Sequence, residues 1–332
     1  VVSIWDPTTD FIGSPGKQTF KPHGCMYTRS SGIGGTVWLE TVPETHITDY
    51  AVVTDVDAGT VSVTLAGAGN LSGAAGTVEV WRDGKALVKG TVSAWNRPVT
   101  LTLPQPVALW SPESPALYDL VLTLSDGAAR TRVVKGYFGM RKFELRKDPN
   151  GVLRFFLNNE ARFIIGTLDQ GWWPDGLLTP PSEEAMAYDI LALKKMGFDM
   201  MRKHIKVEPR RYYALCDRLG ILVWQDFWLA NPSDGPDPDD EALFLANAGN
   251  LMLRIRNHPS LLLWCGRNEG YPPASLDKAL RELVARWDPG RFYLSSSADD
   301  FVSGRGPYRR LPSKAYYRLF ESPGQQWESV KF

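Results

Sequence analysis

The stretch that decides the fold is MMRKHIKVEPRRYYALCDRLGILVWQD, residues 200–226. It begins with an apolar run that predicts a strand over Met200–His204, continues with a helical pattern over Pro209–Leu219, and ends in a second apolar run over Ile221–Asp226. Two short strands joined by a helix form a βαβ unit, whose strands run parallel in one sheet. This part of the chain is therefore predicted to be an α/β domain.

The same alternation continues on both sides of that stretch. We predict further strands over Phe163–Gly166, Leu261–Cys265 and Phe292–Ser295, and further helices over Glu183–Met196, Asp240–Arg256 and Ala274–Trp287. The first of these helices has Ser182 as its expected N-cap and an apolar face made of Met186, Ile190, Leu193 and Met196. A doubly wound sheet would need a Gly-rich first turn, which is absent, so the repeat favours a TIM barrel. The barrel is expected to be incomplete, because a full one takes about 250 residues.

The first part of the chain has a β character instead. Alternating, valine-rich runs bounded by turn residues predict short strands over Val52–Val56, Thr60–Leu65, Thr77–Trp81, Val92–Ala94 and Tyr118–Leu124. Short strands at this spacing are typical of a β-sandwich. The Gly-rich segment 67–76 lacks the lysine of a phosphate-binding loop, so we expect a plain hairpin loop there.

Composition excludes several function classes. The 332 residues include 37 basic and 37 acidic side chains, which disfavours a nucleic-acid or polybasic membrane partner, and no apolar run is long enough to span a bilayer. Cys25, Cys216 and Cys265 are far apart in apolar or helical contexts and are expected to be buried thiols. No zinc-binding spacing occurs, and we expect no metal or organic cofactor.

Polar residues follow the C-terminal ends of the predicted strands, where TIM barrels build their active sites. Asn268 and Glu269 come directly after an apolar strand that includes Trp264. Burial beside aromatic rings would favour the protonated carboxyl of Glu269, as a general acid requires, and Asn268 could donate to a substrate hydroxyl. The alternative is an ordinary Asn-Glu pair that opens the next helix.

Arg202 and His204 are two residues apart on one strand, so both point to the same face. The guanidinium can keep a neighbouring carboxylate ionised and the imidazole can bind substrate or that carboxylate, although a structural ion pair is an alternative. Asp169 and Asp226 could accept hydrogen bonds from sugar hydroxyls, or cap helices. Five tryptophans near strand ends could stack on a sugar ring or belong to the core: Trp172, Trp173, Trp224, Trp228 and Trp264.

These residues form part of an ordered set of motifs that runs through the chain. The set comprises residues 32–40 (GIGGTVWLE), 109–118 (LWSPESPALY), 137–141 (YFGMR), 156–158 (FLN), 194–197 (KKMG), 201–204 (MRKH), 213–220 (YALCDRLG), 222–226 (LVWQD), 256–260 (RNHPS) and 268–269 (NE). In this set the chain resembles glycoside hydrolase family 2, a group of multidomain retaining β-glycosidases. The resemblance implies three domains: the last strands of a jelly-roll sugar-binding domain over residues 1–43, an immunoglobulin-like sandwich over 44–142, and a partial TIM-barrel catalytic domain over 143–332.

The resemblance also implies a site. It assigns the general acid/base to Glu269 and substrate contacts to Asn268, Arg202 and His204, with a carbohydrate as the substrate and no cofactor. The residues around Glu269 are most similar to the branch of β-mannosidases and exo-β-glucosaminidases, so we expect a β-mannoside, β-glucosaminide or β-galactoside.

The chain departs from the family pattern at two places. Gly34 and Gly35 stand where the family has bulkier residues. The nucleophilic glutamate of the family has no match, since Glu321 and Glu328 do not follow apolar strands, and residues 329–332 look like the approach to the strand that would carry it. We therefore expect a fragment truncated at both ends that is inactive alone. A carbohydrate-binding protein without activity, and an inverting hydrolase that pairs Glu269 with Asp169 or Asp226, are the alternatives.

Overall fold

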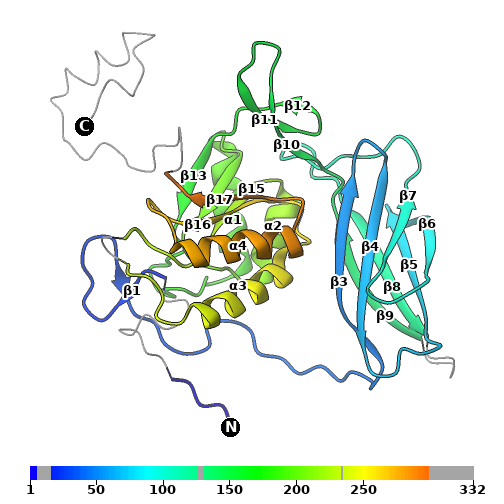
Figure 1. Cartoon of the computed structure of the whole chain (residues 1–332), viewed down its shortest axis with the longest axis horizontal. Coiled ribbons are helices and arrows are strands. Elements are labelled where there is room, and N and C mark those ends of the chain that lie inside the picture. Colours follow the sequence, from blue (N-terminus) through cyan, green and yellow to red (C-terminus); the bar gives the residue numbers. More distant parts are fainter. Residues whose placement is uncertain (6–15, 126–130, 233–234, 299–332) are drawn as a thin grey trace.

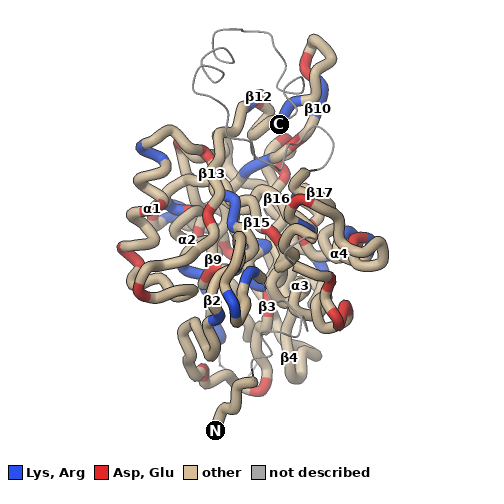
Figure 2. Tube along the Cα trace, turned by 90° about the vertical axis from the view of Figure 1, so that its left-hand side faces the viewer, with Lys and Arg blue, Asp and Glu red and all other residues tan. Residues whose placement is uncertain are grey.

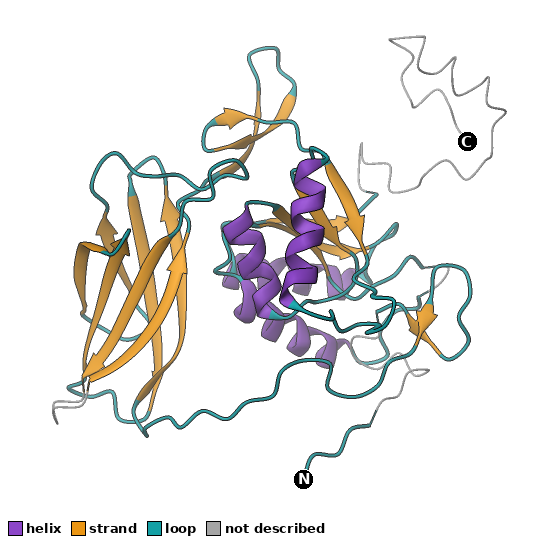
Figure 3. Cartoon of the chain, turned by 180° about the vertical axis from the view of Figure 1, so that it is seen from behind, coloured by secondary structure: helices purple, strands orange, loops and turns teal. Residues whose placement is uncertain are grey.

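The computed structural model describes residues 1–5, 16–125, 131–232 and 235–298. Within them the chain forms an all-β body and an α/β body, joined by a small sheet (Figure 1). The four helices of the described residues all belong to the α/β body, as Figure 3 shows. Acidic and basic residues are interspersed over both bodies rather than segregated (Figure 2). No helix in the described part of the chain is long and apolar enough to cross a membrane.

The all-β body is the predicted sandwich. One sheet has the order β3-β4-β7 and the other the order β6-β5-β8-β9, and every pairing in them is antiparallel. Alternate side chains of β4, β5 and β8, such as Val61, Val78 and Leu120, are completely buried between the sheets. The strands are β3 (His46–Asp55), β4 (Thr60–Ala68), β5 (Ala75–Arg82), β6 (Lys85–Val92), β7 (Pro98–Thr102), β8 (Tyr118–Ser125) and β9 (Thr131–Phe138).

Two predictions in the sandwich are wrong. The predicted strand Val92–Ala94 is only the end of β6, because the chain turns after Val92. The Gly-rich segment is not a hairpin loop, since it leads from β4 in one sheet to β5 in the other. At Gly69 (φ +81°) a Cβ atom would come within 2.8 Å of the Thr45 backbone, so this crossing depends on glycine.

A small antiparallel sheet connects the sandwich to the α/β body. Its strands are β10 (Phe143–Lys147), β11 (Leu153–Leu157) and β12 (Glu160–Ala161), in that order. Phe143 and Phe155 pack with Phe292 of the last parallel strand, so this sheet closes one end of the inner face of the α/β body.

The α/β body is a parallel sheet whose strands follow one another in chain order, β13-β14-β15-β16-β17. A doubly wound sheet would reverse its strand order at a switch point, whereas this order is that of a TIM barrel, here incomplete. The fold class predicted from the sequence is confirmed. The elements are β13 (Gly166–Asp169), α1 (Glu183–Lys195), β14 (Met200–Lys203), α2 (Arg210–Leu219), β15 (Leu222–Asp226), α3 (Glu241–Ile255), β16 (Leu261–Arg267), α4 (Ala274–Trp287) and β17 (Phe292–Ser296).

Helix α1 shows how closely the local predictions hold. Ser182 is its N-cap, as predicted, and its hydroxyl accepts a hydrogen bond from the Ala185 amide. Met186 and Ile190 are buried on the predicted apolar face, but Met196 is 65% exposed because the helix ends at Lys195. The first barrel strand begins at Gly166, three residues later than the start we predicted at Phe163, whose side chain is 84% exposed.

A buried carboxylate links the sandwich to the barrel. Asp217 of α2 accepts hydrogen bonds from the Tyr137 hydroxyl (2.7 Å) and the Ser260 amide (2.9 Å), and its side chain contacts His258 Nδ1 at 2.5 Å. The indole of Trp110 donates to the backbone carbonyl of Asp217 at 2.8 Å. Tyr137 and Trp110 precede the barrel and Ser260 immediately precedes β16. One aspartate therefore joins the sandwich to a strand of the parallel sheet.

The N-terminal segment runs along the α/β body before it reaches the sandwich (Figure 1). In the described part of residues 1–43 the regular strands are β1 (Gln18–Thr19) and β2 (Tyr27–Thr28), which pair in parallel. The jelly-roll assignment of this segment, like the other domain boundaries, stays a prediction. Cys216 and Cys265 are buried free thiols as predicted, whereas Cys25 is exposed.

Candidate functional site

The inner face of the parallel sheet, turned away from the helices, carries most of the predicted site residues. Along β14, Met201 packs into the core shared with the helices, while Met200 belongs to a separate cluster on the inner face. Side chains alternate along a strand, so Arg202 lies on the inner face with Met200. On β15 the same alternation brings Trp224 and Asp226 to that face.

Arg202 and Asp226 form the centre of the site. The Arg202 Nε lies 3.1 and 3.0 Å from the two Asp226 oxygens, and its Nη2 lies 2.7 Å from Oδ2. The same Nη2 also donates to Oδ1 of Asn268 at 2.9 Å. Because a guanidinium only donates, it fixes the orientation of the Asn268 amide, whose NH2 group must point away from Arg202.

His204 and Trp224 complete the bonding of Asp226. His204 Nδ1 lies 2.6 Å from Oδ2 and the Trp224 indole donates to Oδ1 at 2.7 Å. Burial acts to raise the pKa of Asp226, but Arg202 and His204 outweigh it and hold that pKa below its usual value. Burial lowers the pKa of His204 despite the neighbouring carboxylate. A neutral imidazole that donates through Nδ1 presents Nε2 as an acceptor.

Asn268 and Glu269 follow β16 directly and are held by their backbones. The Asn268 amide donates to the Leu229 carbonyl at 3.0 Å, and the Glu269 amide donates to the Ser297 hydroxyl at 3.0 Å. The same hydroxyl lies 3.3 Å from Oδ1 of Asn268. Glu269 has a φ of +50°, a left-handed conformation that is costly for a residue with a Cβ atom. Ser297, the residue after β17 (Phe292–Ser296), therefore contacts both residues; the sequence placed it among the polar strand ends but gave it no role in the site.

The structure overturns the prediction for Trp264. This side chain is completely buried in the core on the helix side of the sheet, where it stacks on Phe227 and donates to Asp288 at 3.0 Å. Trp264 and Cys265 are neighbours in β16, so their side chains point to opposite faces of the sheet, and that of Cys265 is on the inner face. Trp264 is therefore part of the core on the helix side, which does not fit the predicted contact with a sugar at the inner face.

Asp169 belongs to a separate cluster of charges. One of its oxygens accepts from Lys203 (2.8 Å) and Tyr212 (3.2 Å), and the other accepts from the Gly171 amide (2.7 Å). Lys203, which is completely buried, also pairs with Glu208 at 2.8 Å. Both oxygens of Asp169 are thus engaged by the protein, so the geometry favours a structural role over the predicted contact with a sugar hydroxyl.

Lys17 enters the site from the N-terminal segment and was not predicted. Its side chain is only 8% exposed, and Nζ donates to the Gln170 side chain at 3.1 Å. Burial lowers the pKa of this ammonium, while Cys25 and, to a smaller extent, the charge of Glu269 raise it and that of Arg202 lowers it. No spacing in the sequence could have indicated Lys17, because only the tertiary fold brings it near residues of β14 and β16.

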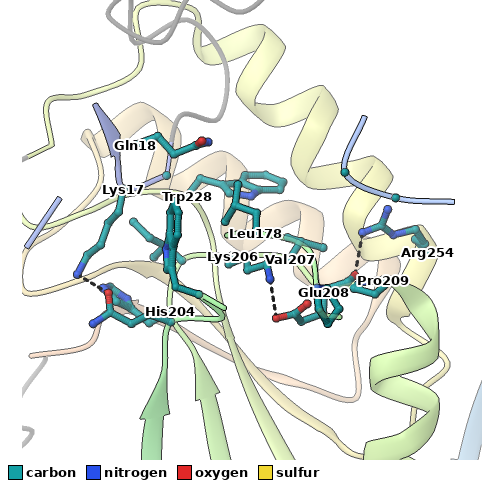
Figure 4. Close-up of a pocket in the computed structure, with 17 residues that line it drawn as sticks. Lys17, Gln18, Leu178, His204, Lys206, Val207, Glu208, Pro209, Trp228 and Arg254 are labelled. Atoms are coloured by element: carbon teal, nitrogen blue, oxygen red, sulfur yellow. Dashed lines mark hydrogen bonds and ion pairs between the residues drawn. The ribbon is translucent and has the colours of Figure 1, made fainter. Parts of the chain in front are cut away.

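A pocket of about 330 Å³ opens beside this network. His204 is one of its lining residues and faces Lys17, as Figure 4 shows. The rest of the lining includes Gly16, Gln18, Gly34, Gly35, Gln170, Trp172, Leu178, Lys206, Glu208, Trp228 and Arg254. The structure thus brings together Arg202, His204, Trp224, Asp226, Asn268 and Glu269, with Lys17 and this pocket alongside. The late candidates Glu321 and Glu328 lie outside the described residues.

Two family models match the chain, one to each body. A model described as glycosyl hydrolases family 2 covers residues 45–141, and a model described as glycosyl hydrolases family 2, TIM barrel domain, covers residues 180–304. The first match corresponds to the sandwich and the second to most of the parallel sheet with the site residues that follow its strands.

Curated relatives and solved structures agree with these matches. The chain is 31% identical over 289 residues to a β-galactosidase of Enterobacter cloacae, an alignment that spans 79% of this chain and 27% of the relative. It is 35% identical over 190 residues to a mannosylglycoprotein endo-β-mannosidase of Lilium longiflorum, over 52% of this chain and 19% of the relative. The structure of a β-D-mannosidase from Dictyoglomus thermophilum matches with a TM-score of 0.64 and 26% identity, over 79% of this chain and 36% of the other.

The chain spans only 27–29% of the length of the first three curated relatives it matches. The matches nevertheless run through both bodies and include the stretch that ends in Asn268 and Glu269. By its sandwich and its barrel alike, the chain belongs to glycoside hydrolase family 2.

Proposed function

We propose that this chain supplies the acid/base side of a β-glycosidase that hydrolyses β-linked sugars with retention of configuration. The observation that carries the proposal is the rim of the parallel sheet, where Arg202 fixes the Asn268 amide and Ser297 fixes the backbone of Glu269. Glu269 protonates the glycosidic oxygen as the leaving group departs and then removes a proton from the attacking water. Asn268 donates from its NH2 group to a substrate hydroxyl.

Double displacement needs a second carboxylate about 5–5.5 Å from the first. We propose that it follows residue 298 in the complete protein. Arg202 and His204 act as positioning residues in this scheme, since Asp226 engages both of them. The sugar is a β-mannoside, β-glucosaminide or β-galactoside.

An inverting mechanism receives less support from the same geometry. It would require Asp169 or Asp226 to activate a water molecule opposite Glu269. Asp226 is completely buried and accepts hydrogen bonds from Arg202, His204 and Trp224, and both Asp169 oxygens accept from the protein. A carbohydrate-binding protein without activity remains the alternative that an assay must exclude.

The test uses the protein produced from its complete gene and a panel of nitrophenyl β-glycosides. Glu269→Gln should lower kcat by about 10²–10⁴-fold, the usual contribution of a general acid/base, because the glycosyl-enzyme then lacks the base that activates water. With an activated nitrophenyl leaving group, added azide should restore turnover, because azide attacks the glycosyl-enzyme without needing a base. Glu282→Gln, on the exposed side of α4, is the matched control and should behave like the wild type. Equal turnover by the Glu269 variant, or an inverted anomer in the product, would refute the proposal.

A further inference from the structure

The pocket beside the site is built from parts of the chain that are distant in sequence. Residues 16–18 and 34–35 of the N-terminal segment form one wall, and residues 204–209 between β14 and α2 form another. His204 belongs both to this wall and to the network around Asp226. At about 330 Å³ the pocket lies at the lower end of the range of ligand sites, roughly 300–1,000 Å³. The pocket meets the site at two side chains that belong to both, Lys17 and His204.

Two partly buried tryptophans of this pocket are held in fixed orientations. Trp172 stacks on Tyr27 with a ring separation of 4.4 Å, and Trp228 meets the ring of Phe244 edge-on at 5.8 Å. In the view of Figure 4, Trp228 stands between the side chains of Lys17 and Lys206. Rigid, flat, apolar rings that line a pocket suit the apolar CH face of a pyranose.

The polar lining offers donors and an acceptor. Lys206 pairs with Glu208 Oε1 at 3.0 Å, and Lys203 binds the same oxygen. The second oxygen of Glu208 is buried and has no hydrogen-bond partner, although the residue is only 2% exposed. A buried acceptor without a donor is costly, so this oxygen is an unused acceptor in the wall of the pocket, which a small side-chain movement would expose to a hydroxyl donor. The ammonium groups of Lys17 and Lys206 can donate to further hydroxyls.

Two adjacent glycines provide the room on the open side. A Cβ atom at Gly35 would meet nothing within 4 Å, and one at Gly34 would meet only Thr179 Oγ1 at 3.5 Å. The backbone there is held in place, because the Thr179 hydroxyl donates to the Gly34 carbonyl and Arg211 donates to Thr36. Neither glycine has a positive φ, so larger side chains fit this backbone and would extend into free space.

We propose that this pocket is a second saccharide subsite, which holds a pyranose unit of an extended β-linked substrate beside the ring bound at Glu269. The inference rests on the proposed function, because it names the kind of substrate that the same site accepts: an oligosaccharide or glycan chain rather than a single sugar on a small aglycone. Gly35 sets the size of the subsite, and Trp228 with Trp172 supplies its apolar surface.

The test fills the pocket from the glycine side in the protein produced from its complete gene. Gly35→Trp should lower kcat/KM for a β-linked trisaccharide about tenfold more than for the nitrophenyl glycoside of the same sugar. Gly35→Ala adds only a Cβ in open space and should keep the wild-type ratio. Gly249→Trp, at another glycine with nothing within 4 Å, controls for the bulk of the new side chain. The inference is overturned if Gly35→Trp lowers kcat/KM equally for both substrates, or for neither.

A binding measurement separates this inference from the proposed function. Trisaccharides of β-linked mannose, glucosamine and galactose are titrated calorimetrically into wild-type protein, Gly35→Trp and Gly249→Trp. If wild-type protein hydrolyses nothing yet binds a trisaccharide, and only Gly35→Trp loses that affinity, the subsite stands and the hydrolase assignment fails. If glycosides are hydrolysed while trisaccharide affinity is the same in all three proteins, the subsite is refuted and the hydrolase assignment stands.

Discussion

Arg202 and Asp226, on adjacent parallel strands, are joined through both carboxylate oxygens, with the shortest contact at 2.7 Å and the aspartate completely buried. Two further donors, His204 and Trp224, converge on the same carboxylate. Asp226 therefore holds Arg202, His204 and Trp224 in place at this edge of the sheet. Arg202 in turn holds the side chain of Asn268.

Asp226→Asn should unfold at lower urea concentration and lose activity. Removing one partner of a buried ion pair leaves the other charge uncompensated, which costs about 3–5 kcal/mol. The matched control is Glu79→Gln in the sandwich, whose partner Lys89 is 61% exposed, and an exposed pair of this kind contributes about 0–1 kcal/mol. Similar losses in the two variants would contradict the role assigned to Asp226.

Two tryptophans on neighbouring strands should respond differently to replacement by phenylalanine. Trp264→Phe removes a buried indole donor from Asp288, so it should lower the free energy of unfolding by about 1–3 kcal/mol and leave KM unchanged. Trp224→Phe removes the donor to Asp226 on the inner face, so it should lower kcat/KM as well. Urea titrations and kinetics on one substrate separate the effects. A raised KM in Trp264→Phe with unchanged stability would restore the sugar contact that the structure rejects.

Asp288→Asn should change how stability depends on pH. Burial raises the pKa of Asp288 from 3.8 to about 7, so the folded state binds a proton that the unfolded state releases between these values. The stability that comes from this group is present below its unfolded pKa and is lost as pH rises towards 7. The asparagine in the variant does not titrate, so the variant does not lose stability in this way. Its Tm relative to wild type should therefore be higher at about pH 8 than at about pH 5. An equal difference at both pH values would contradict the assignment.

Lys17→Met should separate stability from activity. The ammonium is buried beside a neutral amide, so replacing it by an apolar chain of similar length should leave the Tm unchanged or raise it. Activity should fall several-fold, since the positive charge of Lys17 attracts the negative charge of Glu269 and the variant removes that attraction. Lys21→Met, an exposed lysine in the same segment, should change neither. Full activity in Lys17→Met would remove this lysine from the site.

The fold was largely predictable because its signals are local. Each apolar strand and amphipathic helix from Gly166 to Ser296 can be recognised from the residues of its own short segment. Ser182 indicates the start of a helix because its hydroxyl can accept from a backbone amide of the first turn. The β6–β7 region was harder, because a residue such as Val92 fits a strand interior and a strand end equally well. The sheet-to-sheet crossing at Gly69 depends on which strands pair, and no short segment encodes that.

The site was predictable only where strand position alone decides it. Arg202, His204 and Asn268 follow from alternation and from the strand ends, whereas Trp264 shows the limit of that reasoning. A bulky apolar residue suits either face of a buried strand, so its direction depends on the register of β16. Lys17 and Ser297 reach the site through tertiary contacts with segments far away in the sequence. Burial and bonding, rather than residue type, also reveal that Asp169 serves the charge cluster around Lys203.

The carboxylate of Asp217 has a consequence for how such proteins can be recombined. It accepts one hydrogen bond from Tyr137 in the sandwich and another from Ser260, the residue just before β16. A barrel grafted onto a foreign accessory domain would keep this aspartate but lose the phenol and indole that meet α2. The carboxylate would then keep its contacts with Ser260 and His258 but lack the Tyr137 hydroxyl, close to the start of the strand that leads to Glu269. Exchanging the sandwich between such proteins should therefore preserve stability only when residues 110, 137 and 217 are kept as a matching set. The sandwich and the barrel are then best exchanged as one piece.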